Sequence, residues 1–186
     1  MGRNTRQIIL RGRPDGAVSK NNFEFREKKT PELENDDVLV RTIYMSLDPY
    51  MRGRMDSSRS YAASFEVGKP LIAGCIGEVT VSKNDDYSVG DVVMGMLEWA
   101  DYSVVNGNGG LRIIDPKVAP LPYHLGVLGM PGLTAWIGMK EIGKPKKGET
   151  LFVSAASGGV GQIAGQMGRM AGCRVVGCAS SKEKVT

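Results

Sequence analysis

The chain has 186 residues, of which 41% are hydrophobic and 24% charged, which is typical of a globular protein that can bury a core. Its 24 basic and 20 acidic residues give a net charge of +4, and the clearest basic cluster, residues 3–13, contains no aromatic side chain, so nucleic acid is not an expected partner. No stretch approaches the roughly 18–20 apolar residues that cross a membrane, and the N-terminus lacks the apolar segment of a secretory signal, so we expect a cytoplasmic protein with no membrane partner.

The first part of the chain, residues 1–125, is expected to form a β-rich domain. Short apolar runs alternate with polar or glycine-containing turns, which is typical of a small, partly closed barrel. Residues 106–110, Asn-Gly-Asn-Gly-Gly, are a strong hairpin signal between two such runs. The runs expected to form strands are residues 38–44, 76–81, 89–94, 101–105 and 111–114.

Residues 126–149 are expected to link this domain to the next one. Pro131 can begin a helix that covers residues 134–142, and Gly143 is expected to end that helix. The polar segment 144–149 then forms a turn.

Residues 150–186 carry the most informative pattern. An apolar strand at 151–153 runs into the glycine-rich turn 154–161, a helix follows, and a second apolar run begins at 174 directly after Gly172. This order predicts the first strand–helix–strand unit of a doubly wound α/β domain, the Rossmann fold that binds dinucleotides. The apolar face of the helix is expected to consist of Val160, Ile163, Ala164, Met167 and Ala171.

The glycine-rich turn is the expected phosphate-binding element. In the dinucleotide fingerprint, the first glycine makes the turn, the second lets the main chain approach the pyrophosphate, and the third lets the helix pack closely on the strand. The N-terminus of the helix adds unpaired N–H groups and a positive dipole end. A glycine-rich turn that binds nothing is the alternative. The fingerprint positions are Ala156, Gly158 and Gly161, with alanine in place of the first glycine, and the predicted cofactor-binding residues are Ala156, Ser157, Gly158, Gly159, Val160 and Gly161.

The end of the second strand favours NADP(H) over NAD(H). An NAD-specific site places an acidic residue about 20 residues past the fingerprint to hold the ribose hydroxyls. Residues 180–184 read Ser-Ser-Lys-Glu-Lys instead, and two lysines with two hydroxyls suit a 2′-phosphate. Glu183 lies beyond the strand among lysines and is a poor substitute for the acidic residue. A solvated helix start, which would leave the cofactor preference open, is the alternative.

The three cysteines are expected to be unpaired, buried, small apolar residues. Cys173 and Cys178 flank the second strand, whose five residues separate their Cα atoms by about 16 Å. A disulfide requires a separation below about 7 Å, so these two cannot pair across an intact strand.

The α/β domain is expected to be truncated. A doubly wound sheet needs two βαβαβ halves, and the 37 residues after Glu149 can supply only one strand, one helix and a second strand. We therefore expect these 186 residues to be a piece of a longer protein and to be inactive alone.

Four segments in this order carry a family resemblance: residues 45–55 with the run Asp-Pro-Tyr-Met-Arg, residues 128–136, the turn 155–161, and residues 172–177. With them the chain resembles the zinc-lacking medium-chain dehydrogenases/reductases, and within these the branch of leukotriene B4 12-hydroxydehydrogenase and of prostaglandin and alkenal reductases. The bacterial members of that branch look most similar, and the Asp-Pro-Tyr-Met-Arg run is fairly specific to it.

The resemblance implies an α/β protein with a GroES-like catalytic β-barrel domain at 1–125, a junction helix and linker at 126–149, and the beginning of an NADP-binding Rossmann domain at 150–186. It implies an NADPH-dependent oxidoreductase that reduces the carbon–carbon double bond of α,β-unsaturated aldehydes or ketones. Hydride passes to the β-carbon and a proton to the α-carbon. The expected partners are an enone or quinone substrate and, for the longer protein, a second copy in a homodimer.

The resemblance also implies roles for single residues. Tyr50 matches a catalytic-site tyrosine whose hydroxyl can donate a hydrogen bond to the substrate carbonyl, although a tyrosine that only packs in the barrel wall is the alternative. Thr134 would face the nicotinamide, and Lys184 would contact the 2′-phosphate. Arg52 and Arg54 can close the pocket or pair with acidic surface residues. The tyrosine to which the family's main catalytic role is usually given has no counterpart in these residues.

Zinc is not expected, because one histidine, His124, and three dispersed cysteines cannot assemble the ligand sets of zinc alcohol dehydrogenases. His124 itself is expected to be structural. Two other functions stay open. A zinc-independent quinone reductase would share the glycine-rich turn but not the Asp-Pro-Tyr-Met-Arg run, and a non-catalytic GroES-like domain would bind no cofactor.

Overall fold

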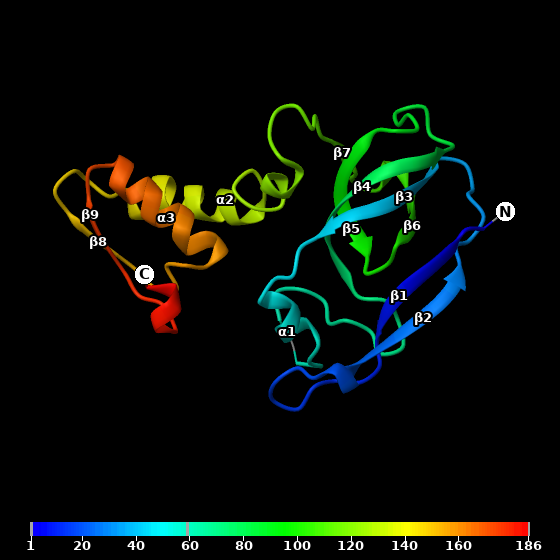
Figure 1. The fold of residues 1–186 in the computed structure, drawn as a ribbon, viewed down its shortest axis with the longest axis horizontal. Helices are drawn as coiled ribbons and strands as arrows, with labels where there is room; N and C mark the ends of the chain where they lie inside the picture. The colour runs from blue at the N-terminus through cyan, green and yellow to red at the C-terminus, as the bar shows by residue number, and fades with distance from the viewer. Residues whose placement is uncertain (1, 59, 186) are drawn as a thin grey trace. The chain divides into compact units, whose positions relative to one another are not determined.

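A computed structural model describes residues 2–58 and 60–185, which form two compact units with a boundary between Val118 and Ala119. Each unit is described by itself. The chain is mixed α/β, as the sequence predicts, with an antiparallel β unit followed by helices and a parallel strand pair (Figure 1).

The first unit is built on two antiparallel sheets. Strands β1 (Asn4–Leu10) and β2 (Phe23–Lys29) form a hairpin, which joins the rest of the unit through bridges from Gln7 to Ala100 and from Ile9 to Pro70. The larger sheet has the order β6-β3-β4-β5-β7. Its strands are β3 (Asp37–Met45), β4 (Ile72–Ser82), β5 (Val92–Glu98), β6 (Tyr102–Asn106) and β7 (Arg112–Ile113).

The core of the first unit lies between these sheets and the short helix α1 (Tyr50–Arg54). Gly77 on β4 lets β3 approach closely, because a Cβ at this position would overlap Val40 Cγ1 and lie 2.6 Å from the carbonyl oxygen of Arg41. The fully buried side chains of the core include Leu10, Val38, Val40, Leu71, Ala73, Cys75, Val79 and Val93.

The hairpin predicted around residues 106–110 is wrong. These residues form the 3-10 helix η2 (Gly107–Gly109), and the strands on either side of it do not pair with each other. Strand β6 pairs with β3 and β7 pairs with β5, so they occupy the two ends of the sheet order. The Tyr87 hydroxyl fixes the turn by donating to the carbonyl oxygens of Gly107 and Leu111, at 3.2 and 2.9 Å. A long-range contact therefore decides the course of the chain at this turn.

The second unit begins with the 3-10 helix η3 (Leu121–His124) and the helix α2 (Met130–Trp136), which continues as the π-helix η4 (Ile137–Gly143). The helical segment begins earlier than residue 134 and ends at Gly143 as predicted. The left-handed residue beyond it is Lys144, with φ of 44°. Glycine at 143 lets the last turn close, since a Cβ there would lie 3.0 Å from the carbonyl oxygen of Gly138.

The predicted strand–helix–strand unit is present. Strand β8 (Thr150–Val153) leads through the glycine-rich turn into α3 (Gly159–Met170), and β9 (Arg174–Gly177) lies parallel to β8. Helix α3 ends before Gly172, which has a φ of 81°. A Cβ at Gly168 would overlap Leu151 Cδ2 and lie 3.1 Å from Val175 Cγ2. Because glycine has no side chain, α3 can pack closely against both strands at this position.

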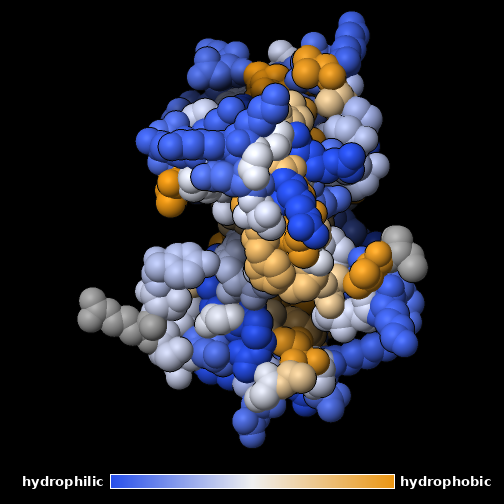
Figure 2. Space-filling view, turned by 90° about the vertical axis from the view of Figure 1, so that its left-hand side faces the viewer, coloured by the Kyte–Doolittle hydropathy of each residue, from blue (hydrophilic) through white to orange (hydrophobic). Residues whose placement is uncertain are grey.

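The opposite face of this strand pair is open. Side chains alternate between the faces of a strand, so Phe152 and Val176 point away from the face that carries Leu151 and Val175. Phe152 is 64% exposed and Val176 39% exposed. On the side of the molecule that Figure 2 shows, apolar side chains are exposed at the surface among polar ones. Parallel sheets are normally covered on both faces, and the described residues cover one.

Candidate functional site

The glycine-rich turn is tied to the end of strand β9. The amide of Ala156 donates to the carbonyl oxygen of Cys178 at 2.9 Å, and the amide of Cys178 donates to that of Val153 at 3.0 Å. Ala155 adopts the left-handed conformation, with φ of 48°, and its carbonyl oxygen accepts the amide of Gly158 at 2.8 Å. The carboxyl ends of both strands therefore meet at this turn, which is where doubly wound sheets bind their ligands.

The two retained fingerprint glycines occupy positions where a side chain would collide with the turn. A Cβ at Gly161 would overlap the carbonyl oxygen of Ala155 and lie 2.9 Å from Ala156 Cα, and a Cβ at Gly158 would lie 3.1 Å from that same oxygen. Alanine replaces the first fingerprint glycine because Gly177 leaves room for it. A Cβ at Gly177 would lie 2.6 Å from Ala156 Cβ.

Helix α3 presents its first amides at the surface. Ser157, Gly159 and Val160 are exposed, and the first intrahelical bond runs from Gln162 N to the carbonyl oxygen of Gly158 at 3.0 Å. The N–H groups of Gly159, Val160 and Gly161 have no partner within the helix, and they lie at the positive end of its dipole. These residues therefore fit the pyrophosphate of a dinucleotide.

A cavity of about 230 Å³ lies beside the turn and brings together three of the predicted cofactor-binding residues, Ala156, Ser157 and Lys184, whereas Gly158, Gly159, Val160, Gly161 and Thr134 are not part of its lining. Lys184 borders it, as do two residues of the turn and the end of β9. The 3-10 helix η5 (Lys182–Lys184) carries the lysine, whose ammonium donates to Ser180 Oγ at 3.4 Å. The residues that line the cavity are Ala156, Ser157, Gly177, Cys178, Ala179, Lys184 and Val185.

Thr134 lies in the same unit, on the exposed side of α2. Its hydroxyl donates to the carbonyl oxygen of Met130 at 2.7 Å, one turn earlier in its own helix. The first turn of α2 reaches the start of α3, since a Cβ at Gly159 would lie 3.7 Å from Pro131 Cβ. The helix that carries Thr134 is thus anchored next to the glycine-rich turn.

Tyr50 lies in the first unit, as the first residue of α1. The Asp48-Pro49 turn that precedes it is held by a bond from Ser46 Oγ to Asp48 Oδ2, at 2.9 Å, and by one from Met51 N to the carbonyl oxygen of Asp48, at 3.0 Å. The tyrosine is half-buried against the core. Its ring therefore packs, and part of its surface is accessible.

Arg52 and Arg54 anchor the loops around α1. The Arg52 guanidinium donates to Asp56 Oδ1 and to the carbonyl oxygen of Gly16, both at 2.7 Å. The Arg54 guanidinium donates to the carbonyl oxygen of Ala63 at 2.8 Å. The predicted pairing with an acidic residue is thus correct for Arg52, whereas Arg54 bonds a main-chain oxygen.

A third arginine, Arg13, acts in the same way, and this role is not predictable from the sequence. Arg13 donates to the carbonyl oxygens of Met55, at 2.7 Å, and Phe65, at 3.3 Å. More than 40 residues of sequence separate Arg13 from each of these partners, and no local sequence pattern predicts such a bond.

The cysteines are free thiols with different surroundings. Cys75 is buried, and this burial raises the pKa of its thiol to about 11. Cys173 is half-buried and Cys178 is exposed, so the expectation that all three are buried is wrong for Cys178, which follows the last residue of β9 and borders the cavity.

His124 is buried at the end of η3. Within residues 2–58 and 60–185, no three or more His, Cys, Asp or Glu side chains are grouped so that they could hold a metal ion. In the same described part of the chain, no helix has the length and apolar character needed to cross a membrane.

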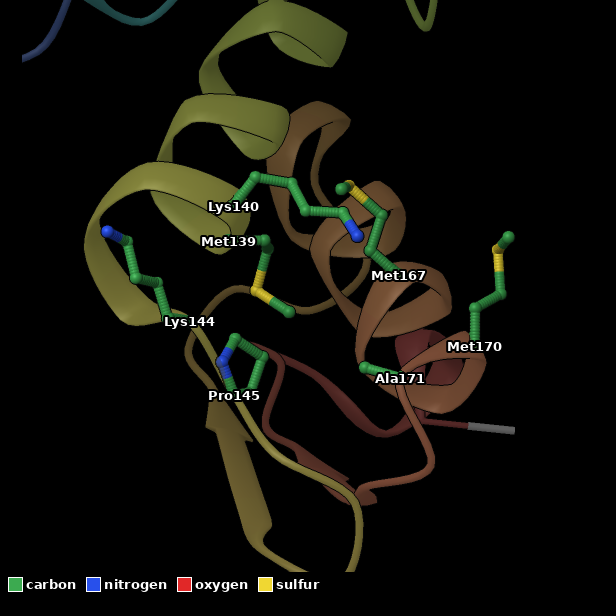
Figure 3. A pocket seen from close by; sticks show the side chains of 7 residues that line it. All are labelled: Met139, Lys140, Lys144, Pro145, Met167, Met170 and Ala171. Atoms are coloured by element: carbon green, nitrogen blue, oxygen red, sulfur yellow. The ribbon is translucent and has the colours of Figure 1, made fainter.

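A separate cavity of about 400 Å³ lies between η4 and α3. Lys140 extends from η4 toward Met167 on α3, above Met139 and Pro145 (Figure 3). The lining combines apolar side chains with two lysines and includes none of the predicted site residues.

Comparison with known proteins finds relatives over almost the whole chain. Residues 6–113 match a family described as the N-terminal domain of oxidoreductase. The chain is 44% identical to the NADPH-dependent curcumin reductase of Escherichia coli, over 96% of this chain and 52% of that protein. It is 45% identical to the NADP(+)-dependent 2-alkenal reductase of Nicotiana tabacum, over 97% and 54%.

The crystal structure of CurA from Vibrio vulnificus in complex with NADPH superposes with a TM-score of 0.90 at 40% identity, over 96% of this chain and 52% of that chain. The chain thus spans about half the length of the relatives that it matches.

Proposed function

The chain belongs to the zinc-lacking branch of the medium-chain dehydrogenases/reductases, and on that premise we propose that its protein is an NADPH-dependent reductase of α,β-unsaturated aldehydes or ketones. The observation that carries the proposal is the cavity at the carboxyl ends of β8 and β9, which joins the glycine-rich turn to Lys184. The names of the similar proteins, which include curcumin, 2-alkenal and (+)-pulegone reductases, support the substrate class.

The predicted cofactor-binding residues are assigned to different parts of NADPH. The first amides of α3 bind the pyrophosphate, and the Lys184 ammonium binds the 2′-phosphate. Thr134 contacts the nicotinamide. When bound, NADPH supplies the hydride that reaches the β-carbon, a proton from solvent completes the α-carbon, and NADP⁺ is the other product.

Tyr50 has its role at the substrate carbonyl. Negative charge develops on that oxygen as the hydride arrives, and the phenolic hydroxyl stabilises it by donating a hydrogen bond. Part of the tyrosine is accessible, and within residues 2–58 and 60–185 its hydroxyl has no hydrogen-bond partner, which supports this role. A homodimer of the longer protein, which the resemblance implies, stays a prediction.

The function is tested on the natively expressed protein by NADPH titration, with NADH as the control, followed by a panel of enones, quinones and saturated ketones. We expect preferential NADPH binding and oxidation of NADPH with enones. Turnover of quinones without enones would identify a quinone reductase instead, and the absence of binding by either cofactor would leave a non-catalytic domain.

Tyr50→Phe is expected to lower kcat for enone reduction about tenfold with little change in KM, because one neutral hydrogen bond to the substrate oxygen contributes about 0.5–1.5 kcal/mol. Steady-state kinetics measure this. Tyr87→Phe is the control, since its hydroxyl bonds only main-chain oxygens among the described residues and its loss should reduce stability instead. An unchanged kcat in Tyr50→Phe would mean that Tyr50 only packs.

Cys178 is expected to react with a maleimide and to be protected by NADPH, because it borders the proposed cofactor cavity. Cys75 should stay unlabelled in the folded protein, since burial both excludes the reagent and disfavours the reactive thiolate. Peptide mass spectrometry with and without NADPH measures both. Equal labelling of Cys178 in the two samples would contradict a cofactor in this cavity.

A further inference from the structure

Helix α1, which begins at Tyr50, is too short to fix its own position. It has five residues, and a helix of this length is not stable in water unless other parts of the protein hold it. Gly53 lies within the helix and lowers its helix propensity further. The contacts that α1 makes with the rest of the first unit therefore decide where Tyr50 lies.

Arg52 ties α1 to the loop between β1 and β2, which lies beside the helix in Figure 1. Its guanidinium donates from Nε, at 3.0 Å, and from Nη2, at 2.7 Å, to the carbonyl oxygen of Gly16. Its third nitrogen, Nη1, donates to Asp56 Oδ1 at 2.7 Å. One half-buried side chain thus joins the loop, the helix and the segment that follows the helix.

Arg13 makes the same connection in the opposite direction. It lies in the loop and donates at 2.7 Å to the carbonyl oxygen of Met55, the residue directly after α1. It also donates to the carbonyl oxygen of Phe65 at 3.3 Å. Both acceptor residues are buried in the core of the unit. Two guanidinium groups therefore cross between the loop and α1, one from each side.

A lysine could not make the contacts of Arg52. Two nitrogens of the guanidinium reach one main-chain oxygen while the third reaches a carboxylate, and this requires the planar fork of arginine. An ammonium group is a compact charge on a flexible stem. Arg52→Lys therefore keeps the charge and can still pair with Asp56, but it loses the forked contact with Gly16.

A shift of α1 would act on the proposed reaction through Tyr50. Tyr50 lies two residues before Arg52 in the same short helix, so a movement of the helix carries the tyrosine with it. The proposed role requires the phenolic oxygen to come within about 2.5–3.0 Å of the substrate oxygen, and a hydrogen bond weakens steeply when its angle is poor. A small displacement of the helix is therefore enough to weaken this bond without unfolding the unit.

We propose that Arg52 and Arg13 are positioning residues for the proposed reaction, which clamp α1 to the loop between β1 and β2 so that the Tyr50 hydroxyl meets the substrate carbonyl. This inference rests on the proposed function. The effect of both arginines on the reaction passes through Tyr50.

The test is a double-mutant cycle on the natively expressed protein, with 2-hexenal as the probe and NADPH oxidation as the signal. The variants are Arg52→Lys, Tyr50→Phe and the double substitution. We expect Arg52→Lys to lower kcat about threefold with little change in KM, because it weakens a bond whose complete loss costs about tenfold. In the Tyr50→Phe background, Arg52→Lys should lower kcat no further, since residues that act through one contact are not additive.

Arg41→Lys is the matched control. Its guanidinium pairs with Glu78 across strands β3 and β4 and makes no bond to α1 or to the loop among the described residues. This variant should keep the kcat of the unmodified protein. Circular dichroism melts show whether each variant is folded. If Arg52→Lys does not fold, Arg13→Lys tests the same clamp from the loop and should show the same dependence on Tyr50.

The outcomes separate this inference from the function on which it rests. An equal loss of kcat in both backgrounds would refute it, because the arginine would then act independently of Tyr50. A lower melting temperature with unchanged kcat would also refute it, since the clamp would only stabilise the fold. If Tyr50→Phe alone leaves kcat unchanged, the inference fails while the reductase function stands. An unmodified protein that reduces neither 2-hexenal nor any enone of the panel would overturn the proposed function itself.

Discussion

Gly161→Ala is expected to weaken NADPH binding about a hundredfold or to abolish it. A methyl group at this position would overlap the carbonyl oxygen of Ala155, which is part of the turn's own backbone and cannot rotate away. Either the turn opens or helix α3 moves off strand β8, and overpacking of this kind costs about 1–3 kcal/mol of stability. Both responses displace the amides that are proposed to bind the pyrophosphate.

Gly165→Ala is the matched control, because it lies one turn later in the same helix and its Cβ would meet Val175 Cγ1 at 3.8 Å, an ordinary contact. Fluorescence titration with NADPH and a thermal melt of both variants give the comparison. Gly165→Ala should bind as the unmodified protein does. If Gly161→Ala binds NADPH normally, the turn is not the pyrophosphate site.

Lys184→Ala is expected to weaken NADPH binding about tenfold to a hundredfold and to leave NADH binding nearly unchanged. A hydrogen bond to a charged group contributes about 1.5–3 kcal/mol, and NADH has no phosphate to lose. The effect should shrink at high salt, because the lysine is exposed and its charge is screened. Titration with both cofactors at two ionic strengths measures this.

Lys182→Ala supplies the control for charge alone. It removes the same charge from the same turn, but the described residues that border the 230 Å³ cavity include Lys184 and not Lys182. Equal losses in the two variants would point to a general attraction by the basic segment, and the assignment of Lys184 to the 2′-phosphate would then be wrong.

The strand–helix–strand unit could be predicted from the sequence because its signals are local. An apolar run, a glycine-rich turn, a helical repeat and the stop at Gly172 follow one another within about 25 residues, and β8, α3 and β9 appear in that order. The shared cavity of Ala156 and Lys184 could be predicted for a related reason. When two parallel strands pair, their carboxyl ends lie side by side, so the turn after β8 and the segment after β9 come together.

The pairing of the β strands could not be predicted in the same way. Asn106–Gly110 is a sound turn signal, yet the strands beside it pair with β3 and β5 because those pairings extend the larger sheet. Neither strand of the β1–β2 hairpin was predicted, and β2 gives little signal because its sequence Phe-Glu-Phe-Arg-Glu-Lys-Lys buries little and is held by pairing with β1. The bonds of Arg13, Arg52 and Arg54 to main-chain oxygens of distant loops have no sequence signal either.

The fit between Ala156 and Gly177 constrains the order in which this turn can evolve. The methyl group of Ala156 occupies the space that a side chain at 177 would need, with 2.6 Å between the two Cβ positions. A lineage that begins with this pair can gain a side chain at 177 only after residue 156 has become glycine, whereas the reverse order passes through a clash. Two substitutions that are each tolerated in the right background are therefore incompatible in the wrong one.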